Sequence, residues 1–223
     1  MRADSAGVLF DVDGTLVDTS YLHTVTWWQA MREHGFDVPM ARIHRAIGMG
    51  ADKLIDHVLG ADPGRDNAAL SAAHLTLYAT YWERLRPLPG AGDLLRAVAA
   101  RGLRVVLASS AQERELAVLR KAIDADDVID AATGASDADA SKPDPDILAV
   151  ALDHGGLAAE RVLVVGDAVW DVHAAGRMGI PCIGLTCGGV SDAELRAAGA
   201  IETYEDPAAL RDALDRSAIA RLA

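Results

Sequence analysis

Val8-Leu9-Phe10-Asp11-Val12-Asp13-Gly14-Thr15 is the stretch from which the fold can be worked out. Its apolar residues predict a buried strand, and the glycine that follows favours a sharp turn at the strand's end. Aspartate is depleted in strands, so two aspartates at the end of an apolar strand point to a task other than packing. Residues i and i+2 of a strand share a face, so we expect the carboxyl groups of Asp11 and Asp13 about 6.6 Å apart.

Four further apolar runs predict buried strands, and helical spacing of apolar residues fills the gaps between the later ones. The strands are expected at 104–109, 128–130, 162–166 and 180–185, and the helices at 90–101, 112–123, 145–154 and 169–178. Strands that alternate with helices predict an α/β fold, namely a Rossmann-like parallel sheet with helices on both faces.

The connection between the first two strands is far too long for a simple crossover. It spans about 90 residues, where about a dozen suffice. Helical spacing at 19–33, 53–59 and 70–85 predicts an inserted α-helical domain. Seven of the ten aromatic residues lie in it, and we expect them mainly to form its own core, with one or two rings facing a ligand. The predicted domains are a core of residues 1–17 and 88–223, and a helical insertion of residues 18–87.

Composition narrows the classes of protein. With 51% hydrophobic and 24% charged residues, the chain is not of the disordered class. A net charge of −12 is unfavourable for binding nucleic acid or an anionic membrane. The two cysteines, Cys182 and Cys187, are too few for a disulfide framework. The sequence shows no signal peptide and no apolar run of the ~18 residues of a membrane span, so we expect a cytoplasmic protein.

Four polar features follow predicted strands, where ligand sites of α/β proteins lie. Each has a simpler explanation by itself: a solvated turn, a helix N-cap or an exposed lysine. Asp144 and Pro145, for example, are expected as the N-cap and first residue of a helix. The four features are Asp11 with Asp13, Asp167 with Asp171 one helical turn later, Ser109 with Ser110 before a helix, and Lys142 before Pro143.

Together the four features predict a site for phosphoryl transfer. Up to four carboxylates at one sheet edge cannot all stay ionised without a cation, and oxygen ligands with a phosphate substrate favour Mg²⁺. Mg²⁺, a lysine and a serine hydroxyl would offset the charge of a phosphoryl group. One aspartate can act as the nucleophile, and a second carboxyl group can protonate the leaving oxygen and then activate water.

These residues resemble the motifs of the haloacid dehalogenase-like hydrolases, in the subgroup with a helical cap (phosphoglycolate phosphatase and β-phosphoglucomutase-like). The resemblance covers nearly the whole chain. The four family motifs stand here as Asp11-Val12-Asp13-Gly14-Thr15, the strand end at Ser109, Lys142-Pro143, and Gly166-Asp167 with Asp171.

The resemblance implies a role for each residue. Asp11 would be the nucleophile that forms an aspartyl-phosphate, and Asp13 the general acid/base, with His23 beside it. Asp171 would support the site through water or Lys142. The implied Mg²⁺ ligands are Asp11, Asp13, Asp167 and Asp171, and the implied phosphate- and substrate-binding residues are Ser109, Ser110, Lys142, Gly14 and His23.

The resemblance favours a phosphatase that acts on a small soluble phosphomonoester. Dehalogenases and phosphonatases of the family lack the second aspartate, which is Asp13 here. The alternative is a phosphosugar mutase, because His23 resembles a β-phosphoglucomutase residue. However, Ala51 occupies the position of the mutase arginine that grips a second phosphate, which leaves Lys53 or Arg45 as candidate contacts for a substrate anion.

Two other classes fit less well. A phospho-accepting receiver domain is shorter and has no helical insertion, and a dinucleotide-binding enzyme needs a glycine-rich turn after the first strand. The sequence leaves open the physiological substrate and whether the protein is a monomer or a homodimer.

Overall fold

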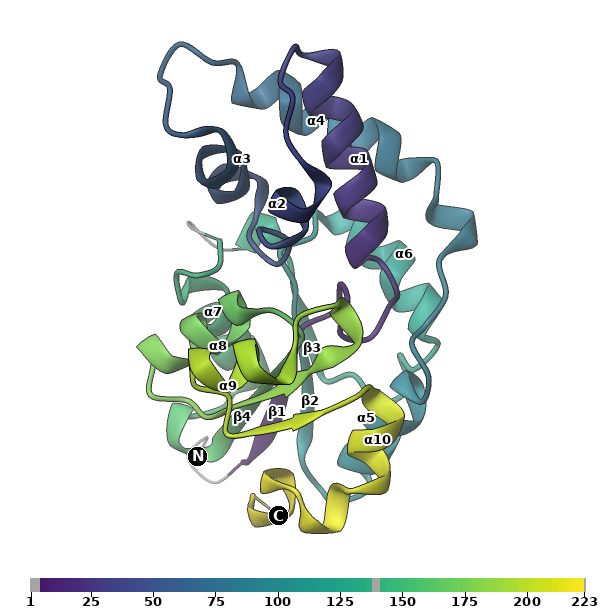
Figure 1. Ribbon diagram of the computed structural model, residues 1–223. Helices are drawn as coiled ribbons and strands as arrows, with labels where there is room; N and C mark the ends of the chain where they lie inside the picture. The colour runs from purple at the N-terminus through teal and green to yellow at the C-terminus, as the bar shows by residue number, and fades with distance from the viewer. Residues whose placement is uncertain (1–4, 138–140, 223) are drawn as a thin grey trace.

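The computed structural model, which describes residues 5–137 and 141–222, contains a six-stranded sheet in the order β3-β2-β1-β4-β5-β6 (Figure 1). Every pair of neighbouring strands is parallel, which confirms the predicted α/β class. The strands are β1 (Gly7–Phe10), β2 (Arg104–Ala108), β3 (Ala131–Thr133), β4 (Val162–Gly166), β5 (Cys182–Leu185) and β6 (Glu202–Tyr204).

Helices cover both faces of this sheet. The helices that follow β1 are α1 (Ser20–Glu33), α2 (Met40–His44), α3 (Ala51–Leu59) and α4 (Asn67–Ala79). The later helices are α5 (Ala91–Ala99), α6 (Glu113–Ile123), α7 (Asp146–Gly155), α8 (Val169–Arg177), α9 (Asp192–Ala198) and α10 (Pro207–Asp212). In Figure 1, α1 to α4 stand above the sheet, whereas α7 to α9 and α5 with α10 flank it.

Alternate residues of the central strand serve the two faces. Val8 and Phe10 are fully buried in a cluster with α5, α6 and α10, whereas Leu9 is buried in a second cluster with α7, α8 and α9. A strand buried on both faces is continuously apolar. The run of apolar residues before Asp11 therefore marks the centre of the sheet.

The carboxyl ends of three adjacent strands, β2, β1 and β4, lie at the same edge of the sheet. The strand order reverses there, between β1 and β4. Asp11 follows β1, Ser109 follows β2 and Asp167 follows β4. In doubly wound sheets this switch point is where a crevice for a ligand opens. The topology alone thus brings together Asp11 and Asp167, which lie 156 positions apart in the chain.

Two predicted strands lie later in the chain than expected, and one strand was not predicted. The strand predicted at 128–130 lies three residues later, at β3, because Val128 belongs to a turn in which its N donates to Ala125 O. The edge strand β6 was not predicted, because Glu-Thr-Tyr is short, half-buried and carries no apolar run. Strand β5 begins two residues later than predicted, after Pro181, whose nitrogen has no hydrogen to donate.

The helices between β1 and α5 have a hydrophobic cluster of their own, which includes Trp27, Met31, Ile43 and Leu54. The aromatic residues are divided, however, since Tyr78 packs into the cluster beneath α5. The short helix α2 was not predicted. Within the described residues, none of the helices combines the length and the apolar character needed to cross a membrane.

Candidate active site

Three buried carboxylates form the floor of the site. Asp11 comes from the end of β1, Asp167 from the end of β4 and Asp171 from the first turn of α8. One oxygen of each lies within 4.8 Å of the others. The spacing of Asp167 and Asp171 had suggested that both lie in one helix. Helix α8 begins only at Val169, however, so Asp167 lies in the loop before it. The loop still brings both carboxylates to the same place.

Lys142 is the cation beside these carboxylates. Its Nζ lies 2.6 Å from Asp11 Oδ1 and 2.7 Å from Asp171 Oδ1, and it donates a hydrogen bond to Ala108 O. The side chain is 2% exposed. Burial alone would lower the pKa of Lys142, but Asp11 and Asp171 raise it above the ordinary value, so the ammonium group stays charged.

One ammonium group does not balance three buried carboxylates. Burial raises the pKa of Asp11 to about 7, even though Lys142 lowers it. Burial, followed by the charges of Asp11 and Asp171, raises the pKa of Asp167 well above the ordinary value. A site with excess negative charge and only oxygen donors fits a hard divalent cation. The residues present therefore fit the Mg²⁺ expected from the sequence.

Two hydroxyl groups that the sequence analysis did not single out complete the floor. Thr15 Oγ1 lies 2.9 Å from Asp11 Oδ2 and 2.8 Å from Asp167 Oδ1, and its one proton can serve either carboxylate. Ser20 Oγ lies 3.4 Å from Asp167 Oδ2. The signal for Thr15 was its place directly after Gly14. Nothing in the sequence pattern marks Ser20.

Two glycines allow the backbone to approach Asp167. Gly14 has φ +81°, and a Cβ there would lie 2.5 Å from Asp167 Oδ2. A Cβ on Gly188, after β5, would lie 1.6 Å from the same oxygen. Gly14 N donates to Val17 O. Gly188 was not predicted as a site residue.

A second group of polar side chains surrounds Asp13. Its Oδ1 accepts a hydrogen bond from Thr19 Oγ1 and lies 3.2 Å from His23 Nε2. His23 Nδ1 in turn lies 3.2 Å from His74 Nε2, and Glu115 Oε1 lies 3.6 Å from His23 Nε2. His74 and Glu115 were not predicted. The one signal for each is helical spacing to an apolar residue.

This group favours a proton on His23. Burial lowers the pKa of His23, but Asp13 and then Glu115 raise it above the ordinary value. Burial raises the pKa of Asp13, but the hydrogen bond and charge of His23, together with Thr19 and Lys142, lower it below the ordinary value. Burial lowers the pKa of His74, so its neutral ring accepts from His23. His23, whose Nδ1 side bonds to neutral His74, therefore holds a proton on Nε2 beside Asp13 Oδ1.

The two serines after β2 have different environments. Ser109 Oγ accepts a hydrogen bond from Ala111 N and is fully buried. Ser110 Oγ is also buried, and it finds no partner among the residues that the structure describes. Helix α6 begins at Glu113, so these serines lie in the loop between β2 and the helix, before the helix as expected. An unpartnered buried hydroxyl is suited to hold a ligand oxygen.

A cavity of about 370 Å³ opens above the carboxylate floor. Asp11, Asp13 and Ser110 line it from the core, and Trp27 and His74 line it from α1 and α4. Trp27 is thus an aromatic ring that lines the cavity. The helices after β1 provide the opposite wall.

Three other residues have different partners from those expected. The Asp144 carboxylate binds Lys53 and Arg177, so it is not an N-cap, and α7 starts one residue after Pro145. Lys53 is therefore engaged away from the cavity. Arg45 points toward Glu194, at 3.9 Å.

Comparisons with known proteins agree with this geometry. The family model described as "haloacid dehalogenase-like hydrolase" matches residues 6–179. A phosphoglycolate phosphatase from Yersinia pestis is 32% identical over 188 residues, which cover 82% of this chain and 81% of that protein. A 5'-nucleotidase from Pseudomonas aeruginosa is 31% identical over 210 residues, covering 93% and 95%.

Comparison with solved structures also finds a similar hydrolase. The crystal structure of a hydrolase from Pseudomonas syringae superposes with a TM-score of 0.89 at 33% identity, and the match covers 95% of this chain and 99% of that one. The family match extends over most of the chain and spans all four sequence motifs. The chain belongs to the haloacid dehalogenase-like hydrolases.

Proposed function

We propose that this protein is a Mg²⁺-dependent phosphatase that hydrolyses a small soluble phosphomonoester through a phosphoryl group on Asp11. The observation that carries the proposal is the junction of Asp11, Asp167, Asp171 and Lys142 beneath one cavity. The similarity to a phosphoglycolate phosphatase and a 5'-nucleotidase supports phosphomonoester hydrolysis.

Asp11 and Asp167 would hold the metal, with Asp171 beside them and Asp13 contributing through its backbone carbonyl. A bound Mg²⁺ would neutralise the carboxylates and draw charge from the phosphoryl oxygens. Lys142 would bind a phosphoryl oxygen while it keeps Asp11 ionised and oriented. Ser109 and Ser110 would donate hydrogen bonds to the other oxygens from the end of β2.

The first step would be attack of an Asp11 carboxylate oxygen on phosphorus. The bond from phosphorus to the ester oxygen breaks, and Asp13 passes to that oxygen the proton that His23 Nε2 holds. In the second step Asp13 takes a proton from water and passes it back to His23, the water oxygen bonds to phosphorus, and the bond to Asp11 breaks. Free phosphate leaves, and both aspartates return to their starting state.

We further propose that residues 18–87 form a cap domain over a catalytic core of residues 1–17 and 88–223. The two connections lie side by side, since Asp18 N donates to Arg86 O and Leu88 N donates to Leu16 O. Paired connections suit a hinge. Crystals with and without a phosphate mimic should differ in the orientation of residues 18–87 as one body, and identical orientations would contradict this.

A direct assay tests the function and the need for metal. The purified protein should hydrolyse 4-nitrophenyl phosphate with Mg²⁺, lose turnover in excess EDTA and regain it when Mg²⁺ is restored. Turnover that is unchanged in EDTA would contradict the metal assignment, and no turnover with Mg²⁺ would contradict the proposed activity.

A phosphosugar mutase is the second candidate, because the contact between His23 and Asp13 would serve that reaction equally. β-Glucose 1-phosphate with a sugar bisphosphate primer separates the two. The mutase would give the isomeric sugar phosphate, whereas the phosphatase gives free phosphate alone.

A further inference from the structure

The cavity wall above the carboxylate floor has an unusual charge. Among the described residues that line the cavity, none is Lys or Arg. Two further acids line it instead, Asp52 and Glu115. Glu115 is 5% exposed, and the basic group beside it is His23. Positions 138–140, outside the described residues, read Ala-Asp-Ala and contain no basic residue.

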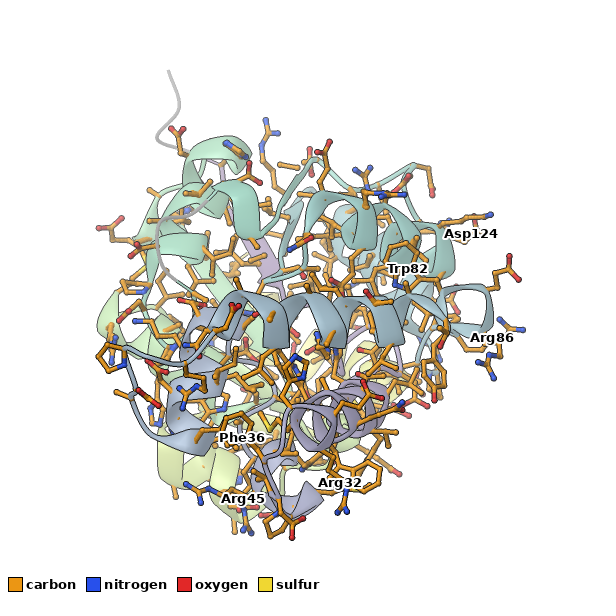
Figure 2. The ribbon with its side chains drawn as sticks, turned by 90° about the horizontal axis from the view of Figure 1, so that it is seen from above. Arg32, Phe36, Arg45, Trp82, Arg86 and Asp124 are labelled. Atoms are coloured by element: carbon orange, nitrogen blue, oxygen red, sulfur yellow. The ribbon has the colours of Figure 1, made fainter. Side chains whose placement is uncertain are left out.

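Two basic side chains of residues 18–87 are already paired with acids. Lys53 Nζ lies 2.5 Å from Asp144 Oδ2, and Arg65 pairs with Asp56 in the same way. Arg45 is exposed, and in Figure 2 the side chains of Arg32 and Arg45 lie at the edge of the molecule. The helices of residues 18–87 therefore present no lysine or arginine to the cavity, and their protonated His23 is held by Asp13.

Lys142 cannot take that task either. It is fixed at the floor between Asp11 and Asp171, where its charge is balanced. A second anionic group on a substrate would therefore have to leave water for a wall that offers it two carboxylates and no lysine or arginine, and whose protonated ring, His23, is already held by Asp13 and Glu115. Burying a charge without a partner is strongly unfavourable.

The same wall suits an uncharged group. Its apolar part comes from Ile47, Met49 and Leu75, and its polar part from the neutral hydroxyl of Ser71 and the amide of Gln112. Hydroxyl groups of a ligand can bond to these and to the backbone, and carbon atoms can pack on the apolar residues. The volume of about 370 Å³ leaves room for a phosphoryl group and a small leaving group.

We propose that the natural substrate is the phosphomonoester of an uncharged, hydroxyl-bearing alcohol, and that the cavity discriminates against esters that carry a second anion. This inference rests on the proposed phosphatase function. The proposed substrate differs from phosphoglycolate, for which one relative is named and which carries a carboxylate beside the phosphate.

Matched substrates test the inference. 2-Hydroxyethyl phosphate and 2-phosphoglycolate differ only in CH₂OH against carboxylate, as glycerol 3-phosphate and 3-phosphoglycerate do. We expect kcat/KM for the uncharged member of each pair to be at least about ten-fold higher, which corresponds to about 1.4 kcal/mol. If a pair is not turned over, the inhibition constants of its members against 4-nitrophenyl phosphate give the same comparison.

Met49→Lys places a cation on the wall with a side chain of similar length, and Met49→Gln is the uncharged control. Met49→Lys should raise kcat/KM for 2-phosphoglycolate relative to 2-hydroxyethyl phosphate by about ten-fold. Met49→Gln should leave that ratio within about two-fold of the wild-type value.

The possible outcomes distinguish the proposed preference for uncharged esters from the proposed phosphatase function. Equal or greater preference for the doubly anionic esters, in a protein that hydrolyses 4-nitrophenyl phosphate, would overturn the inference and leave the phosphatase function intact. Absence of 4-nitrophenyl phosphate turnover would overturn the proposed function itself. A ratio that Met49→Gln moves as much as Met49→Lys would show that the wall acts through shape and not through charge, and would also overturn the inference.

Discussion

Asp11→Asn is expected to lower kcat for 4-nitrophenyl phosphate by about 10,000-fold or more, because an amide oxygen cannot act as the nucleophile. The substitution conserves volume at a buried position and removes one of the three crowded carboxylate charges. The protein should therefore fold at least as well as the wild type without metal. The measurement is a steady-state assay with Mg²⁺, beside a thermal unfolding curve.

The matched control is Asp18→Asn. Asp18 lies in the same loop but is exposed, and its backbone N bonds to Arg86 O, which the substitution leaves unchanged. Its kcat should stay within about two-fold of the wild-type value, as for other exposed substitutions. If folded Asp11→Asn kept a tenth or more of the activity, Asp11 would not be the nucleophile.

Lys142→Met is expected to lower the free energy of unfolding by about 3–5 kcal/mol without metal, because it leaves Asp11 and Asp171 buried with no counter-charge. Turnover should fall as well, since a phosphoryl oxygen loses its ammonium partner. Urea unfolding in EDTA measures the first effect. Added Mg²⁺ should restore part of the stability, because a cation bound to Asp11 and Asp167 offsets the same charges.

Lys53→Met is the control for loss of a lysine. Lys53 pairs with Asp144 near the surface, where such pairs contribute about 1 kcal/mol or less. If Lys142→Met does not fold, Lys142→Arg keeps the charge and tests the ammonium geometry through kcat. Wild-type unfolding and wild-type turnover in Lys142→Met would contradict the role of the buried lysine.

Strands with long apolar runs were predictable from the sequence. The prediction for β4 matches the structure residue for residue, because a strand buried on both faces has no polar position to blur its ends. The edge strands β3 and β6 were displaced or missed, because three-residue, half-buried strands are defined by pairing with a neighbour, and this pairing leaves little trace in local sequence.

The carboxylates of the site could be predicted for a similar reason. Asp11 and Asp167 end apolar strands, where an acid is conspicuous, and parallel topology then brings them together. Glu115, His74 and Ser20 were missed, because each occupies an ordinary place on a helix. Only the fold shows that these helices face Asp13 or Asp167.

A crystal structure grown with Mg²⁺ and a fluoride mimic of the phosphoryl group tests the central claim most directly. We expect one Mg²⁺ bound by Asp11 and Asp167, and the mimic against an Asp11 oxygen with Lys142 Nζ in contact. A mimic bound away from Asp11, or a metal that binds neither Asp11 nor Asp167, would contradict this expectation.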